Sequence, residues 1–325
     1  MADNPHIGNR ETRSARPRRS QRILVGVSLL ALAAATALIS SGALRPSSAR
    51  ATNVAVGDDA PMIRVPIALT HAIPTPTGPP VAASGGCIGL PILYYHYIRV
   101  NPDPRDHLGF QLSVTPKNFQ AQMDWLRIAG GHPVTLAQMM ASLQGGPALP
   151  AHPVVLTFDD GHDDFATQAV PVLLRNHFVA TSFVVPGFLG RPEYMSNQQV
   201  QQVAQEGMVI GAHTVHHVDL TRVAAPVAQS EIASSKALLE QLIGQPVDDF
   251  AYPYGSVSPA VAAMAAHAGF RDASATTGGT LQCLSNRFQL HRLEVLGSHS
   301  LAQFASEAGV PAPPPNWIDP GPPPG

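Results

Sequence analysis

The sequence of 325 residues is poor in charged residues and in cysteine, and these shortages exclude several classes of protein. Charged residues make up 13% of the chain, about half of the usual share of ~25%. A formal net charge of −2 provides no basic surface for a nucleic acid, so we expect no nucleic-acid partner. Two cysteines are too few for a disulfide framework or for a zinc site built from thiolates. Hydrophobic residues still make up 45%, which excludes a chain that is disordered throughout.

Proline, with 32 residues, is in excess, and more than half of it lies near the two ends of the chain. Nine prolines fall within residues 1–86 and eight within residues 311–325. Residues 87–310 are therefore nearly ordinary in proline content, and they are numerous enough to bury the core of one domain. Their 11 Lys and Arg against 17 Asp and Glu make this domain mildly acidic. We expect a Pro- and Ala-rich linker over residues 45–86 and a Pro-rich tail over residues 311–325.

The N-terminus combines basic residues with one long apolar run. Residues 1–22 contain six arginines, and residues 23–44 contain neither a charge nor a proline. This run matches the roughly 20 residues that cross a bilayer and exceeds the apolar part of a signal peptide, about 7–15 residues. We expect a cytoplasmic basic segment, a transmembrane signal anchor over residues 23–44 and an extracytoplasmic domain. The alternative is a cleaved signal at Ala49–Ala51, which would leave the domain secreted.

Within residues 87–310, apolar runs of strand length alternate with segments that carry helix-start signals. An N-cap followed by proline occurs at Thr115 and again at Ser258, and Ser196 with Gln199 forms a capping box. This alternation predicts an α/β fold with mostly parallel strands, open or closed into a barrel. The expected strands cover residues 90–98, 154–158, 181–185, 208–212, 250–252, 273–276 and 290–295. In such folds the chemistry lies just past the C-terminal ends of strands.

The first candidate site is the sequence TFDDG, which directly follows an expected strand. Side chains of adjacent residues at a strand end diverge, so Asp159 and Asp160 can serve different tasks, one on a metal and one on a proton. The alternative interpretation is an Asp-Gly turn with a helix cap.

The second candidate site, His213 to His217, follows the expected strand 208–212. Two histidines four residues apart lie on one face of a helical turn. With one carboxylate they form a common ligand set for zinc or another divalent metal. Surface histidines are the alternative. We expect His216, between them, to take no part.

The third candidate site is the sequence FAYPYG at residues 250–255, again after an expected strand. Proline and glycine here predict a defined loop whose backbone N–H groups are able to point inward. Tyr252, Pro253 and Tyr254 would give it an aromatic rim of the kind that binds sugar rings. The alternative is a tight turn with packed tyrosines.

Together these three sites resemble the polysaccharide deacetylases with a NodB homology domain, carbohydrate esterase family 4, over about residues 88–300. TFDDG is similar to the first motif of that family, and His213 to His217 fit its H-[ST]-x-x-H motif. The sequences LYYHYI (residues 93–98) and AYPYG resemble the subgroup that acts on poly-N-acetylglucosamine. The resemblance implies a distorted (β/α) barrel.

The resemblance also implies roles for individual residues. Asp160, His213 and His217 would bind a divalent metal, by default Zn²⁺, with Co²⁺, Ni²⁺ or Fe²⁺ as alternatives. Asp159 would act as the general base, and the backbone N–H of Tyr254 would help to stabilise the oxyanion.

The general acid and the partner of the base are less well marked. His291 is the candidate acid by resemblance, and a packed strand residue is the alternative. Many family members have an arginine beside the base where this chain has Ala251, so Arg292 is a candidate replacement. The tryptophan that often follows Asp272 in the family is also missing. His96 lies near a strand end and either reaches the mouth of the site or is a structural histidine.

Cys87 precedes the first expected strand and Cys283 the last. In a closed barrel these points are neighbours at the end away from the site. An oxidising exterior permits a disulfide there, and two free thiols are the alternative.

The sequence thus predicts a metal-dependent hydrolase that removes N-acetyl groups from extracellular or cell-wall polysaccharide containing N-acetylglucosamine. An O-acetyl esterase of the xylan type is an alternative on the same scaffold. A non-catalytic glycan-binding relic is a further alternative, motivated by Ala251.

Overall fold

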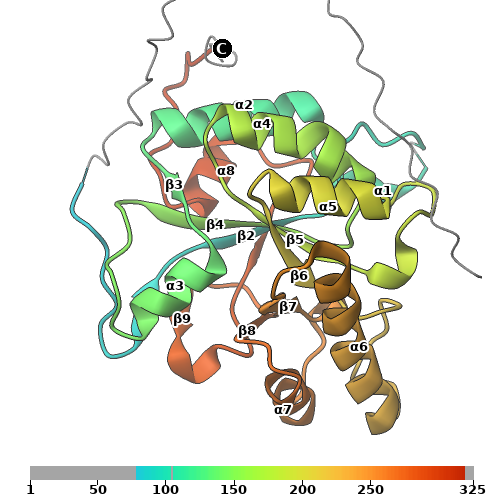
Figure 1. Ribbon diagram of the computed structural model, residues 1–325. Helices are drawn as coiled ribbons and strands as arrows, with labels where there is room; N and C mark the ends of the chain where they lie inside the picture. Colours follow the sequence, from blue (N-terminus) through green and yellow to red (C-terminus); the bar gives the residue numbers. More distant parts are fainter. Residues whose placement is uncertain (1–77, 104, 319–325) are drawn as a thin grey trace, which may run out of the picture. The chain divides into compact units, whose positions relative to one another are not determined.

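The structure is a computed structural model that describes residues 78–103 and 105–318 (Figure 1). The expected basic segment, the expected anchor and most of the linker therefore lie outside the described residues. Within the described part, no helix is both long and apolar enough to cross a membrane.

The centre of the domain is a curled sheet of parallel strands surrounded by helices (Figure 1). Its strands lie in the order β10-β2-β4-β5-β6-β7-β8, and the two-residue strand β3 (His132–Pro133) pairs with β4. Strands β2, β4 and β5 are buried along their whole length, as expected for a sheet covered on both faces. The bounds are β2 Ile92–Tyr95, β4 Pro153–Phe158, β5 Thr181–Val184, β6 Val209–Ala212, β7 Asp249–Ala251, β8 Asp272–Ser274 and β10 Leu293–Glu294.

One extended segment near the C-terminal end of the domain connects the two edges of this sheet. Leu290 forms a parallel bridge with Ser274 of β8, and β10 pairs in parallel with β2 through Leu293 and Leu93. The residues between these pairs, including Arg292, therefore lie where the curled sheet closes. This arrangement agrees with the expected distorted (β/α) barrel.

Local sequence signals explain where several helices begin. Thr115 caps α2 through a hydrogen bond from the Asn118 N–H, and Ser196 and Gln199 form the expected capping box of α5. Helix α3 has the same type of box, from Thr135, although it was not among the expected helices. The bounds are α1 His107–Leu112, α2 Pro116–Ile128, α3 Leu136–Leu143, α4 Val170–Arg175, α5 Asn197–Gln205, α6 Ala225–Ile243, α7 Pro259–His267 and α8 Leu301–Glu307, with short helical turns at Phe165–Ala169, Pro186–Phe188, Pro253–Gly255 and Leu284–Asn286.

An aromatic cluster anchors the C-terminal ends of β2 and β4, the two strands that lead into the site. The rings of Tyr95 and Phe158 stack with centroids 5.0 Å apart, and Phe119 of α2 contacts both. The hydroxyl of Tyr95 donates to Gln122 Oε1 at 3.1 Å. This packing holds the strand ends from which the next residues, His96 and Asp159, project.

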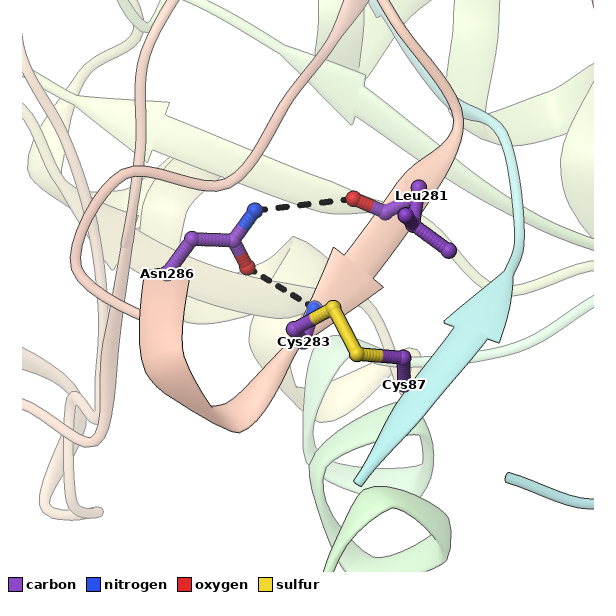
Figure 2. The surroundings of a disulfide bond; sticks show 4 residues. All are labelled: Cys87, Leu281, Cys283 and Asn286. Atoms are coloured by element: carbon purple, nitrogen blue, oxygen red, sulfur yellow. Dashed lines mark hydrogen bonds between the residues drawn. A yellow bond between two sulfur atoms is a disulfide. The ribbon is translucent and has the colours of Figure 1, made fainter. Parts of the chain in front are cut away.

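The two cysteines form a disulfide, which confirms the expected pairing (Figure 2). Strands β1 (Cys87–Gly89) and β9 (Leu281–Cys283) run antiparallel with Cys87 opposite Cys283. Asn286 supports this ribbon because its Oδ1 accepts the N–H of Cys283 at 2.8 Å (Figure 2). Cys87 leads through β1 into the N-terminal end of β2, away from the strand ends that carry Asp159 and His213.

Candidate active site

The two adjacent aspartates diverge at a sharp turn after β4. Asp160 adopts a left-handed backbone conformation with φ 72°, and Gly161 follows with φ 77°. A Cβ on Gly161 would meet the Cγ1 of Val184 at 3.1 Å, so a glycine fits this turn best. The turn directs Asp160 toward two histidines and leaves Asp159 inside the barrel. Non-glycine residues in the left-handed backbone region are frequent at functional sites.

The histidines come from a loop after β6 rather than from the helical turn that the sequence predicted. Thr214 and His217 have φ of 60° and 54°, which bends the loop so that both imidazoles approach Asp160. The Nε2 atoms of His213 and His217 lie 3.5 Å and 3.2 Å from Asp160 Oδ1. One ligand atom from each of the three residues lies within 4.8 Å of the others.

The hydrogen bonds around this cluster fit a bound cation. His213 Nδ1 lies 2.7 Å from the carbonyl oxygen of Ala251, so Nδ1 carries the proton and Nε2 presents a lone pair. Burial, the largest effect, lowers the pKa of His213 to about 4 and keeps the ring neutral. Asp160 Oδ1 is buried and lacks a hydrogen-bond partner among the described residues. Two acceptors that face each other without a proton need a cation, and two imidazoles with one carboxylate suit Zn²⁺ or a related metal.

The second oxygen of Asp160 faces His162, a residue that was not among the candidates named from the sequence. His162 Nε2 lies 3.4 Å from Asp160 Oδ2, and its Nδ1 lies 3.2 Å from the carbonyl oxygen of Glu193. The ring stacks on Tyr97 at 3.9 Å and also contacts Tyr194 at 4.8 Å. Its only signal in the sequence is its position directly after TFDDG.

Burial raises the pKa of Asp160, but the neighbouring imidazoles of His162, His217 and His213 outweigh it. The pKa therefore lies well below its usual value, and the carboxylate stays charged.

Asp159 forms a buried ion pair with Arg292. Its two carboxylate oxygens accept hydrogen bonds from Nη1 at 2.7 Å and from Nη2 at 2.8 Å. Arg292 Nε donates to the carbonyl oxygen of Ala275 at 3.0 Å, and the guanidinium lies over the ring of Tyr94. Arg292 thus occupies the role that the family arginine would have at Ala251, which confirms the expected replacement.

Burial alone would raise the pKa of Asp159, but the charge of Arg292, the charge of His213 and the hydrogen bonds from Arg292 lower it below its usual value. The carboxylate is therefore ionised and held in one orientation, as a general base requires.

Of the two remaining candidate histidines, His96 lies near the aspartates. It follows the C-terminal end of β2, and its charge lowers the pKa of both Asp159 and Asp160. Its Nδ1 lies 3.6 Å from Glu294 Oε1. The side chain is 20% exposed.

The structure places His291, the candidate acid, away from this cluster. His291 precedes Arg292 in an extended segment, so their side chains point to opposite sides. Its Nδ1 forms a hydrogen bond with Thr277 Oγ1 at 2.9 Å. Sequence alone could not show which side of the closing segment faces the barrel interior.

Two residues of the third candidate site, Tyr252 and Pro253, are buried, whereas Tyr254 is exposed beside His217. Tyr252 is fully buried, and its hydroxyl donates to the carbonyl oxygen of Phe288 at 2.9 Å, so this side chain is a structural part of the wall. Pro253 is buried as well. Tyr254 is 65% exposed, has φ 60° and contacts the ring of His217 at 4.7 Å.

A cavity of about 550 Å³ opens beside the metal cluster. His217 and Tyr254 line one part of it, and Asp219, Arg222 and Ser256 line another. Asp219 accepts a hydrogen bond from Ser256 at 3.3 Å and pairs with Arg222 at 3.2 Å. His216 is 59% exposed and bonds to Glu231 instead, so it lies outside the cluster as expected.

Comparison with known proteins places this geometry in a family. Residues 147–273 match the family model described as polysaccharide deacetylase. The chain is 30% identical over 217 residues to the putative polysaccharide deacetylase YxkH of Bacillus subtilis, covering 67% of this chain and 75% of that protein. It is 34% identical over 119 residues to the poly-beta-1,6-N-acetyl-D-glucosamine N-deacetylase of Escherichia coli K12, covering 32% of this chain and 18% of that protein.

A solved structure shows the same fold. The deacetylase PplD of Streptococcus pyogenes, in complex with acetate, superposes with a TM-score of 0.63 at 28% identity, covering 67% of this chain and 97% of that one. The similarity therefore extends over most of both chains. The chain belongs to the polysaccharide deacetylase family of hydrolases.

Proposed function

We propose that this protein is a divalent-metal-dependent deacetylase that removes N-acetyl groups from extracellular or cell-wall polysaccharide containing N-acetylglucosamine. One observation carries the proposal. Asp160, His213 and His217 bring three metal-ligand atoms within 4.8 Å of one another, and the preceding residue, Asp159, is a buried carboxylate paired with Arg292. A cation site beside an oriented base is the arrangement that metal-assisted amide hydrolysis needs.

The residues of this chain divide the work of the reaction. Asp160, His213 and His217 would hold the metal, which supplies Lewis-acid activation when bound. Asp159, kept ionised by Arg292, takes the proton from the attacking water. The backbone N–H of Tyr254 is the candidate donor to the oxyanion, because this residue lies against His217.

His96 is the best-placed donor to the leaving amine. A general acid must protonate the nitrogen as the amide bond breaks, and His96 is the histidine outside the metal set whose charge acts on both aspartates. Glu294 Oε1 lies 3.6 Å from His96 Nδ1 and limits the orientations of the ring. His291 is not among the groups that lower the pKa of Asp159 and Asp160, and its side chain bonds to Thr277 instead of an acidic residue.

The substrate class follows from the cavity and from the relatives. The cavity next to His217 has an exposed tyrosine at its rim, and aromatic rings pack well on sugar rings. The E. coli relative acts on poly-beta-1,6-N-acetyl-D-glucosamine, as its name states. We therefore favour an N-acetylglucosamine polymer over the acetylated xylan of the esterase alternative.

The non-catalytic alternative loses its motive, since Arg292 replaces the arginine missing at Ala251. The esterase alternative uses the same metal site and has to be separated by assay.

We further propose that residues 23–44 anchor the chain in the membrane and that the domain, within residues 87–310, acts outside it. The disulfide between Cys87 and Cys283 supports this location, because disulfides persist in oxidising compartments. Residues 45–86 would then separate the domain from the bilayer.

The decisive experiment is acetate release from chito-oligosaccharides and from β-1,6-linked N-acetylglucosamine oligomers. The protein is stripped with a chelator and reloaded with Zn²⁺, Co²⁺, Ni²⁺ or Fe²⁺. We expect release only after reloading and its loss in Asp159→Asn, while His216→Gln, whose side chain lies outside the cluster, keeps it. Absence of acetate from every N-acetylated glycan with metal-loaded protein would overturn the proposal, and release from acetylated xylan alone would favour the esterase.

A further inference from the structure

A second cavity, of about 430 Å³, lies between the loop after β2 and the turn that follows TFDDG. Its residues are close to the cluster through His162. The carbonyl oxygen of Glu193, which lines the cavity, contacts both the Nδ1 of His162 at 3.2 Å and the N–H of Asp163 at 3.0 Å. Only the imidazole of His162 lies between this carbonyl and Asp160.

The cavity has excess negative charge. Three acidic residues line it, and the single arginine there, Arg99, pairs with one of them, Glu193, at 2.9 Å. Neither Asp163 nor Asp164 forms an ion pair within the described residues. A cation would therefore compensate two carboxylates.

Asp164 is the buried member of this pair and is incompletely satisfied. Its Oδ2 accepts the N–H of Ile98 at 2.9 Å, whereas Oδ1 has no hydrogen-bond partner among the described residues. The residue is only 7% exposed, yet it lines the cavity. Burial, the largest effect, raises the pKa of Asp164 to about 6, although the charges of His162 and Arg99 and the hydrogen bond from the Ile98 N–H lower it.

The other walls of the cavity are apolar and suit a sugar ring rather than a hydrated metal ion. Ile98, Val100, Pro102 and Pro116 contribute apolar residues to the lining, beside the acidic ones. A ligand that combines an apolar face with a positively charged donor matches both the apolar and the acidic residues of this lining.

We propose that this cavity is a subsite for a glucosamine unit, whose ammonium group binds Asp164 and Asp163. The inference rests on the proposed function, because deacetylation converts each N-acetylglucosamine unit into such a cation. The subsite lies one imidazole ring away from the metal cluster, so it takes a neighbouring unit of the same polymer. The enzyme would then prefer polymer in which deacetylation has already begun.

The test measures binding without turnover, by titration calorimetry on the full-length protein kept metal-free with a chelator. The probes are tetramers of glucosamine and of N-acetylglucosamine, each β-1,4- and β-1,6-linked. We expect tighter binding of a glucosamine tetramer and loss of this preference at high salt. Asp164→Asn keeps an acceptor for the Ile98 N–H and should weaken that binding about 10–100-fold, the usual effect of a hydrogen bond to a charged group.

Two further variants make the result specific. Asp163→Asn should weaken glucosamine binding in the same direction, and it provides the test if Asp164→Asn does not fold. The control is Asp103→Asn, an acid on the loop after β2 that pairs with Arg105 and does not line the cavity. Equal affinity for the two kinds of tetramer, or an equal effect of Asp103→Asn, overturns the subsite.

The failure of this inference is distinguishable from that of the proposed function. Acetate release by metal-loaded wild-type protein reports the function alone. Glucosamine binding by the metal-free protein reports the subsite alone, since glucosamine tetramers carry no acetyl group to remove.

Discussion

At the scale of single residues, two adjacent carboxylates are given different tasks by their partners. Asp160 faces His213 and His217, whose Nε2 atoms lie 3.5 Å and 3.2 Å from its Oδ1, and this oxygen has no hydrogen-bond partner among the described residues. Asp159 has both oxygens bonded to one guanidinium. The first environment suits a cation and the second keeps a carboxylate ionised, although the two residues are adjacent in the sequence.

The Arg292 ion pair leads to a prediction about pH. The folded-state pKa of Asp159 is lowered, so its contribution to stability is present above the unfolded-state pKa and is lost as the pH falls through the folded value. Arg292→Met removes the charge and the hydrogen bonds of the guanidinium, so burial then raises that pKa. We expect the acid limb of the kcat/KM profile to move to higher pH and stability to fall by roughly 3–5 kcal/mol.

Arg292→Lys keeps the charge without the two parallel hydrogen bonds and should show a smaller shift. Arg287→Met, outside the site, is the control. An unchanged acid limb in Arg292→Met would show that this arginine does not set the protonation of the base.

His162 leads to a second prediction at this scale, concerning metal affinity. Because its ring lies between Asp160 Oδ2 and the Glu193 carbonyl, it orients a ligand without being one. We expect His162→Gln to weaken Zn²⁺ or Co²⁺ binding about 10–100-fold, as loss of outer-shell partners usually does. Competition with a chromogenic chelator measures this directly. His132→Gln removes a remote histidine that also contacts a backbone carbonyl, and it should leave affinity unchanged.

At the scale of elements, strands β7 and β8 begin with two carboxylates placed opposite each other. Asp249 and Asp272 are paired in register and both are buried. Burial, the largest effect, raises the pKa of Asp249 to about 6 and that of Asp272 well above its usual value. The raised pKa values favour one proton on this pair, which lies at the N-terminal end of the two strands, opposite to the site.

This pair predicts an unusual dependence of stability on pH. Since both pKa values are raised, the favourable contribution is present at low pH and is lost as the pH rises through the folded-state values. Asp272→Asn should remove part of this loss and stabilise the domain at pH 8 by on the order of 1 kcal/mol or more. Thermal unfolding between pH 5 and pH 8 measures the effect. A wild-type stability that rises over this interval, with Asp272→Asn parallel to it, would contradict the shared proton.

The strands and helices also show which elements can be foreseen from local signals. Capping residues before α2, α5 and α7 identified their starts, because a cap is satisfied within one helical turn. Helix α3 carried the same signal and was missed. Strand β10 is shorter than the apolar run 290–295 that predicted it, because pairing partners, rather than apolar residues, decide where a strand ends.

At the scale of the whole molecule, the disulfide joins the first strand of the domain to a late one. Cys87 and Cys283 lie 196 residues apart, so the bond restricts nearly the whole unfolded domain. We expect the double replacement of both cysteines by serine to lower stability by about 2–5 kcal/mol. Thermal unfolding of the wild type with and without dithiothreitol should reproduce the difference. Equal unfolding temperatures in both comparisons would show that the bond does not stabilise the domain.

The sequence by itself determined the chemistry that is encoded locally. TFDDG and the two histidines specify ligand types, a base and a tight turn within a few residues, and these short motifs are enough to indicate the family. The predicted helical turn at His213 to His217 was wrong, because left-handed residues in a loop achieve the same convergence. Adjacent residues can specify a ligand set, but the backbone path between them depends on what surrounds it.

Only the tertiary structure decided which distant residues complete the site. Asp159 and Arg292 are 133 residues apart, and they meet because the segment between Leu290 and β10 closes the curled sheet. The same closure directs His291 outward, so we propose His96 rather than His291 as the general acid. In an extended segment alternate side chains face opposite sides, so the register of one late strand selected Arg292 for the interior and excluded its neighbour.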